Sequence, residues 1–250
     1  MKKLLALVLV CFLLPAVASV GVRVAGSHPT SWRSADWSSS GMLPQADADA
    51  DAAIYVLAAR TGGLKGALAV HSWIVFKRAG DTSYTRYDKV GWGSPVRMNS
   101  RAADGMWYSN PPVIVGAVTG AQAARLIPEL EAAIAAYPYS QPGGYRLWPG
   151  PNSNTFVATV LRAVPELRIQ LPPEAVGKDY LPLSRPVAVS PDWLNLDISL
   201  GGFAGFGIGR DTGIEFRLGG LVFGADVLNP ALKLPGFGRV GMAPYSAPTS

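Results

Sequence analysis

Cysteine and histidine are nearly absent from this chain. Its 250 residues include one cysteine, Cys11, and two histidines. A disulfide framework needs paired cysteines, and zinc sites built from cysteine and histidine need several such ligands. We therefore expect no disulfide and no metal site, and no sequence motif indicates another cofactor.

Charged residues are also scarce. They make up 16% of the chain, against 49% hydrophobic residues, which excludes an intrinsically disordered protein. The 22 lysines and arginines exceed the 17 acidic residues and give a net charge of +5, but they are scattered along the sequence. A nucleic-acid partner is therefore not expected. The length favours one domain of about 200 residues with terminal tails.

The N-terminus has the sequence of an export signal. Two lysines precede an apolar run over residues 4–14, and an Ala-x-Ala sequence ends at Ala18, which predicts cleavage after that residue. The uncharged stretch, however, covers residues 4–22 and approaches the roughly 20 residues that span a bilayer. Residues 1–22 are thus predicted to be a signal peptide or an N-terminal membrane anchor. Either interpretation places the rest of the protein in the periplasm or cell envelope.

Four regions are expected after this segment. Residues 23–53 read as an extended arm and linker, and residues 54–190 as an α+β core. Residues 191–240 read as a glycine-rich β-meander packed on the core, and residues 241–250 as a tail.

Short runs of β-branched and aromatic residues, separated by glycine- or aspartate-containing breaks, predict strands. Apolar residues at helical spacing predict helices at 121–136 and 154–163. The stretch beyond residue 232 is rich in proline and glycine and predicts irregular backbone. The predicted strands are 54–59, 68–77, 84–90 and 113–118 in the core, and 193–200, 203–209, 213–218 and 221–225 in the meander.

Two segments carry residues suited to catalysis. His71 lies within predicted strand 68–77, where a lone histidine is most often a core residue bonded to a backbone carbonyl. Asn152, Ser153 and Asn154 open the second helix, where asparagine and serine are common because their oxygens cap free N–H groups. Together the segments offer a nucleophile at a helix N-terminus, where the dipole favours negative charge, and a base on a strand. This is a papain-type arrangement with the histidine ahead of the helix.

The helix start Asn152-Ser153-Asn154-Thr155-Phe156 resembles the Asn-Cys-x-x-Phe sequence of the circularly permuted papain-like superfamily, which includes lecithin:retinol acyltransferase. Ser153 stands where that pattern has cysteine. The resemblance implies an α+β fold with a permuted papain-like core, in which an antiparallel sheet packs on two helices.

A longer resemblance is carried by segments spread along the chain. They include Ala-Asp-Trp-Ser-Ser at 35–39, His-Ser-Trp-Ile at 71–74, Tyr-Thr-Arg-Tyr at 84–87, Gly-Trp-Gly at 91–93 and residues 145–156, 177–180, 221–224 and 230–236. They are similar to an uncharacterised bacterial family, domain of unknown function 3750. That resemblance implies an exported or membrane-associated bacterial protein without an established activity.

Catalysis would require a serine mechanism. Cys11 lies within the export segment, so the candidate nucleophile is the Ser153 hydroxyl, which needs a positioned base, and His71 is the candidate base. A third residue should fix the imidazole tautomer. Asp88 is the acidic candidate for that role, with Tyr87, Asn99 and Asn110 as alternatives.

Three functions fit these residues. The first hypothesis is a non-catalytic domain that binds a lipid or cell-wall fragment. The second is a serine-dependent hydrolase or acyltransferase acting on an envelope amide or ester. The third is a structural protein that rests on a membrane surface through the meander. The expected ligand contacts are Asn152 and Asn154, an aromatic groove of Trp73, Trp92, Trp107, Tyr145 and Trp148, and Arg86 for an anionic group.

Overall fold

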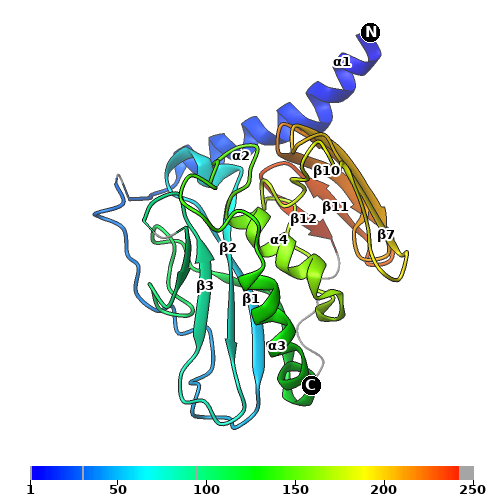
Figure 1. The fold of residues 1–250 in the computed structure, drawn as a ribbon. Helices are drawn as coiled ribbons and strands as arrows, with labels where there is room; N and C mark the ends of the chain where they lie inside the picture. The colour runs from blue at the N-terminus through cyan, green and yellow to red at the C-terminus, as the bar shows by residue number, and fades with distance from the viewer. Residues whose placement is uncertain (1, 30, 94, 242–250) are drawn as a thin grey trace.

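Two antiparallel sheets, with helix α4 (Ser153–Ala163) between them, form the body of the protein. The computed structural model describes residues 2–29, 31–93 and 95–241. Helices and antiparallel sheets are mixed, as the α+β class predicts. In Figure 1 the N-terminal helix runs along one end of the molecule, and its first turns project past the second sheet.

The first sheet has five strands in the order β4-β3-β2-β1-β5, each antiparallel to its neighbours. Its central strands β1 and β2 are buried almost throughout, which explains why their sequences are nearly continuous apolar runs. The strands are β1 (Ala53–Arg60), β2 (Val70–Lys77), β3 (Thr85–Lys89), β4 (Val96–Met98) and β5 (Val113–Thr119). The sequence predicted all of these except β4.

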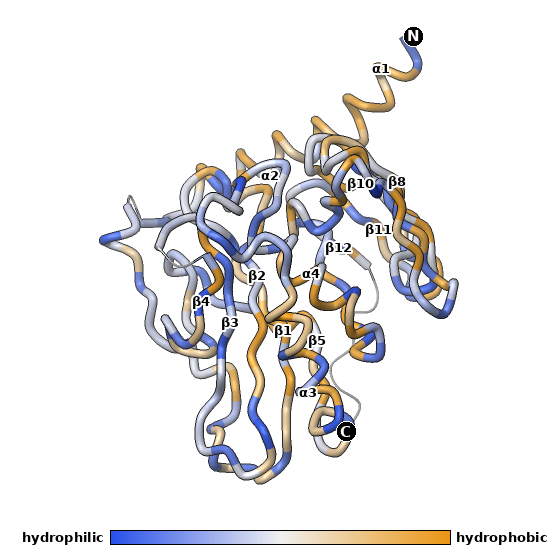
Figure 2. The backbone as a smooth tube through the Cα atoms, in the orientation of Figure 1, coloured by the Kyte–Doolittle hydropathy of each residue, from blue (hydrophilic) through white to orange (hydrophobic). Residues whose placement is uncertain are grey.

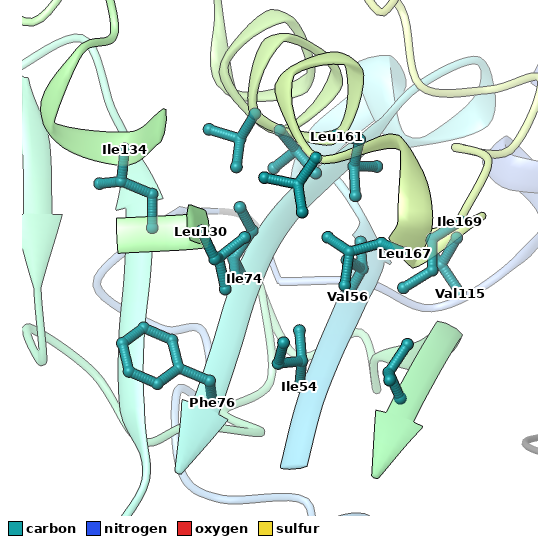
Figure 3. Packing of buried hydrophobic residues seen from close by; sticks show 14 of the residues in the cluster. Ile54, Val56, Ile74, Phe76, Val115, Leu130, Ile134, Leu161, Leu167 and Ile169 are labelled. Carbon is teal, nitrogen blue, oxygen red and sulfur yellow. The ribbon is translucent and has the colours of Figure 1, made fainter. Parts of the chain in front are cut away.

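Helices α3 (Gly120–Ala135) and α4 cover one face of this sheet. Successive strand residues point to opposite faces, so Ile54, Val56, Ile74 and Phe76 all face the helices. Figure 3 shows these side chains meeting Leu130 of α3 and Leu161 of α4. This apolar layer fixes α4 against β2.

The opposite face of the sheet is covered by the segment after the N-terminal helix. Leu43 packs there with Leu57, Trp73 and Trp107 in a second apolar cluster. Asp104 holds the segment in place, since its carboxylate accepts hydrogen bonds from Ser39 Oγ at 2.6 Å and Met42 N at 2.8 Å. Part of the predicted arm is therefore a layer of the fold.

The second sheet is a meander of seven strands in chain order. The sequence predicted β7 to β10, but its prediction of irregular backbone beyond residue 232 is wrong, because two more hairpin strands follow. The tail beyond residue 241 lies outside the described residues. The strands are β6 (Val187–Val189), β7 (Asn195–Ser199), β8 (Ala204–Gly209), β9 (Gly213–Leu218), β10 (Leu221–Asp226), β11 (Ala231–Leu234) and β12 (Gly238–Gly241).

The N-terminal segment is one helix of 24 residues, Lys2–Ala25, long and apolar enough to cross a membrane. It comprises α1 (Lys2–Val8), a π-helical turn η1 (Leu9–Leu13) and α2 (Leu14–Ala25), and so ends three residues beyond the predicted boundary. Such a helix occurs both in signal sequences and in membrane anchors. Its second half contacts the body, where Ser19 Oγ donates hydrogen bonds to Ala67 O at 2.6 Å and Gly236 O at 3.2 Å.

We expect the mature protein to retain this helix. Ser19 is only 7% exposed, so cleavage after Ala18 would place a new charged amino group in a buried position, which is unfavourable. Intact-mass measurement of protein purified from membranes should give the full-length 26.3 kDa. A mature N-terminus at Ser19 would contradict the expectation.

Candidate active site

His71 is the second residue of β2 and faces the side of the sheet that carries the second apolar cluster. Its ring stacks on Trp107 with centroids 3.7 Å apart and planes 5° from parallel. Its Nε2 lies 3.3 Å from Oδ2 of Asp88 on β3. His71 is 4% exposed and Asp88 is 1% exposed, so this contact is shielded from water.

Asp88 also contacts a buried cation. Arg86 Nη2 lies 3.4 Å from Asp88 Oδ2, and the guanidinium stacks over Trp73 at 4.2 Å. Burial alone would raise the pKa of Asp88, but the hydrogen bond from His71 and the charge of Arg86 prevail and hold that pKa below its ordinary value. Burial lowers the pKa of His71.

The hydrogen bond with Asp88 selects the tautomer of His71. An ionised carboxylate only accepts hydrogen bonds, so the proton of the neutral imidazole must sit on Nε2 and be donated to Asp88. Nδ1 then carries the free lone pair. A neutral, oriented imidazole with a free Nδ1 has the form that a general base requires.

Among the four candidates for the orienting residue, Asp88 is the one that bonds to His71. Tyr87 points to the other side, where its hydroxyl donates to Met98 Sδ. The amide oxygen of Asn99 accepts from the backbone of Arg86, and that of Asn110 accepts from Arg23.

The start of α4 is capped by Asn152. Its Oδ1 accepts hydrogen bonds from the backbone N–H groups of Asn154 at 2.9 Å and Thr155 at 3.1 Å, and its Nδ2 donates to Val176 O. Ser153 is the first helical residue and its hydroxyl takes no part in capping. Within the described residues, neither the Ser153 N–H nor its hydroxyl has a hydrogen-bond partner. This N–H and the hydroxyl therefore stay available at the positive end of the helix dipole.

Two hydrogen bonds tie this helix start to the beginning of β2. Ser72 Oγ donates to Asn154 Oδ1 at 2.8 Å, and Asn154 Nδ2 donates to Val70 O at 2.9 Å. Ser153 and His71 are the chain neighbours of this bonded pair. His71 and Ser72 point to opposite faces of the sheet, and no hydrogen bond joins Ser153 to His71 among the described residues. The ring of His71 therefore lies on the face of β2 opposite to α4.

Comparison with known proteins identifies the family. Residues 51–180 match the family described as Protein of unknown function (DUF3750), and they make up just over half of the chain. The chain belongs to this family. The match includes His71, Asp88 and Ser153, whereas the resembling segments before residue 51 and beyond residue 180 lie outside it. No curated protein and no solved structure matches the chain.

The aromatic residues of this DUF3750 chain do not line one groove. Trp73 is completely buried and its Nε1 donates to Ala103 O. Trp92 is 54% exposed beside Arg97, and the ring of Tyr145 lies near Lys89. Trp148 packs instead on the second sheet, where Nε1 donates to Gly219 O.

Three of the predicted ligand contacts have structural roles. Arg86 is 1% exposed and pairs with Asp88, so it offers no charge to an external anion. Asn152 and Asn154 use their amides on the backbone and on Ser72. The sequence did not indicate the roles of Trp107 and Ser72, which hold the histidine ring and the helix start. Both residues depend on contacts between distant parts of the chain.

A cavity of about 160 Å³ lies elsewhere in the DUF3750 chain, between α4 and the second sheet. Its lining includes Arg162, Lys178, Asp179 and Arg217 but neither Ser153 nor His71. Lys178 and Arg217 pair with Glu215, at 3.0 and 2.7 Å. This polar cavity is therefore separate from the candidate active site.

Proposed function

We propose that this protein is an exported, serine-dependent hydrolase or acyltransferase acting on an amide or ester of the cell envelope. Ser153 is the nucleophile, His71 the general base and Asp88 the residue that orients the base. The observation that carries the proposal is the buried His71–Asp88 hydrogen bond on a strand whose next residue, Ser72, is bonded to the start of the helix that bears the uncapped Ser153. The chain order of histidine before helix supports a permuted papain-like core, with serine replacing cysteine.

In this mechanism His71 Nδ1 takes the proton of Ser153 Oγ as the oxygen attacks the carbonyl carbon of the substrate. The C=O electron pair moves to oxygen, and the Ser153 N–H and the helix dipole stabilise that oxyanion. The imidazolium then gives its proton to the leaving amine or alcohol, which leaves an acyl-serine. Water or an acceptor hydroxyl attacks the acyl-serine by the same route and restores the hydroxyl.

Asp88 allows this reaction cycle to run at neutral pH. It stays ionised because His71 and Arg86 stabilise its charge, and it therefore stabilises the imidazolium that forms during attack. No hydrogen bond joins Ser153 to His71 among the described residues, so the mechanism requires the two side chains to approach each other around the start of β2.

A small alkyl fluorophosphonate tests the nucleophile directly. We expect it to label the full-length protein at Ser153, as located by peptide mass spectrometry, because the probe captures serines activated by a base. Ser153→Ala should abolish labelling. Ser34→Ala, at an exposed serine between the N-terminal helix and β1, should leave it unchanged.

A cysteine variant separates chemistry from folding. Ser153→Cys, made together with Cys11→Ala, should react with iodoacetamide faster than a free thiol, because a base and a helix dipole favour the thiolate. The proposal would be contradicted by folded protein that takes up no fluorophosphonate and whose Ser153→Cys variant has a thiol of ordinary reactivity. That result would support the non-catalytic ligand-binding hypothesis.

A further inference from the structure

The second sheet has its polar and apolar faces reversed relative to a soluble antiparallel sheet. On β9, Glu215 and Arg217 are buried, at 1% and 6% exposed, whereas Phe216 between them is 50% exposed. The same alternation occurs on β11, where Lys233 is 4% exposed and Leu232 is 53% exposed. In soluble antiparallel sheets the apolar face normally turns inward.

Strand pairing extends this reversal across the whole sheet. Ile198 of β7 pairs with Phe206 of β8, which pairs with Phe216 of β9. Phe216 pairs in turn with Phe223 of β10, and Leu232 of β11 pairs with Val240 of β12. Paired residues share a face, so one outer face runs from β6 to β12 and carries no charged side chain. An exposed apolar surface of this extent marks an interaction site.

The N-terminal helix lies against the same face. The ring of Phe12 is 6.0 Å from that of Phe223, and both Cys11 and Phe12 are buried there. The helix before this contact, α1, has no buried residue and projects past the sheet (Figure 1). Figure 2 shows that the helix is hydrophobic over most of its length. A membrane that takes up α1 therefore also meets the outer face of the sheet.

We propose that the outer apolar face of the second sheet, together with the N-terminal helix, docks on and partly enters a lipid bilayer. Lipid is the occupant that fits, because protein interfaces keep a polar rim and hydrogen-bonding groups. This face carries neither across its seven strands, and the backbone groups of the inner strands are already satisfied by pairing. The proposal does not depend on catalysis by Ser153.

Site-specific fluorescence tests this docking in the full-length protein. A Cys11→Ala background leaves no other thiol, so Ile208→Cys and Phe216→Cys can each carry an NBD label on the outer face. Val113→Cys is the matched control, since Val113 is 58% exposed on β5 of the first sheet. The protein is reconstituted into vesicles of phosphatidylcholine and phosphatidylglycerol, with or without doxyl-labelled lipid.

We expect both outer-face labels to emit at shorter wavelength than the control, to lose most of their fluorescence to doxyl lipid and to resist iodide. The Val113 label should emit at longer wavelength, keep its fluorescence in the presence of doxyl lipid and be quenched by iodide. Outer-face labels that remain open to iodide would overturn the proposal, since the helix alone would then be the anchor. Labels that resist iodide but are not quenched by doxyl lipid would also overturn it, because a second protein copy would then cover the face. Circular dichroism of each labelled variant checks that it is folded. Agreement between the two labelled positions shows that the result does not come from a local disturbance at one of them.

Discussion

Asp88→Asn should lower the rate at which Ser153 reacts with a fluorophosphonate by about 10⁴-fold, the size of effect that the same change has on a serine triad elsewhere. The cause is a change of tautomer rather than a loss of contact. An asparagine NH₂ group pointing at His71 would donate to Nε2, and the imidazole proton would then move to Nδ1. Nδ1 could no longer accept the serine proton. Stopped-flow labelling with the fluorophosphonate measures the rate.

The scarcity of histidine makes the tautomer itself observable. His71 and His28 are the two histidines of the chain, so ¹⁵N spectra of the imidazoles contain few signals to assign. We expect His71 to carry its proton on Nε2 in the wild type and on Nδ1 in Asp88→Asn, with His28 as internal reference. An unchanged tautomer together with a lost rate would contradict the orienting role, because the loss would then reflect a local disturbance around Arg86, which loses its ion-pair partner.

The pH profile gives an independent check. Burial lowers the pKa of His71 from its ordinary 6.5, so the imidazole stays neutral to lower pH than a free histidine. The wild-type labelling rate should therefore rise with pH, with its midpoint below 6.5, and be level above it. A midpoint above 6.5 would mean that another group limits the reaction.

The strands that position the site were predictable, but the contacts within the site were only partly so. Asp88 was a candidate because it is an acidic residue on β3, the strand that follows β2 in the chain. The sequence 70–77 is buried at every position, so periodicity could not show which face His71 occupies. Its stacking on Trp107 depends on a loop that folds back over the sheet. No local sequence pattern predicts the position of that loop.

The second sheet shows a different limit of sequence reasoning. Its alternation defines two faces correctly, but it does not say which face is inside. An apolar face is ordinarily assigned to the core. Here the charged face turns inward because Lys178, which is outside the sheet, completes an ion cluster with Glu215 and Arg217. The last two strands, β11 and β12, were not predicted because each has only four residues. The turn between them contains Gly236 and Gly238 at positive φ, and these glycines made the segment read as irregular backbone.

Glu215→Gln should strongly destabilise the protein, by about 3–5 kcal/mol of unfolding free energy. The carboxylate is bonded to three buried cations: Lys178 Nζ at 3.0 Å, Lys233 Nζ at 2.6 Å and Arg217 Nη2 at 2.7 Å. Removing its charge leaves those cations buried with too few partners. Denaturant unfolding in detergent measures the loss. The control is Glu131→Gln on α3, whose exposed pair with Arg78 should contribute less than about 1 kcal/mol.

The same carboxylate sets how stability depends on pH. Burial would raise the pKa of Glu215, but the three cations prevail and hold it far below the ordinary 4.5. A lowered folded-state pKa means that the stabilisation is complete above about 4.5 and is lost progressively as the pH falls further. Wild-type unfolding free energy should therefore drop more steeply between pH 5 and pH 3 than that of Glu215→Gln. Equal slopes would show that the cluster does not hold the charged face inward, and the exposed apolar face would then need another cause.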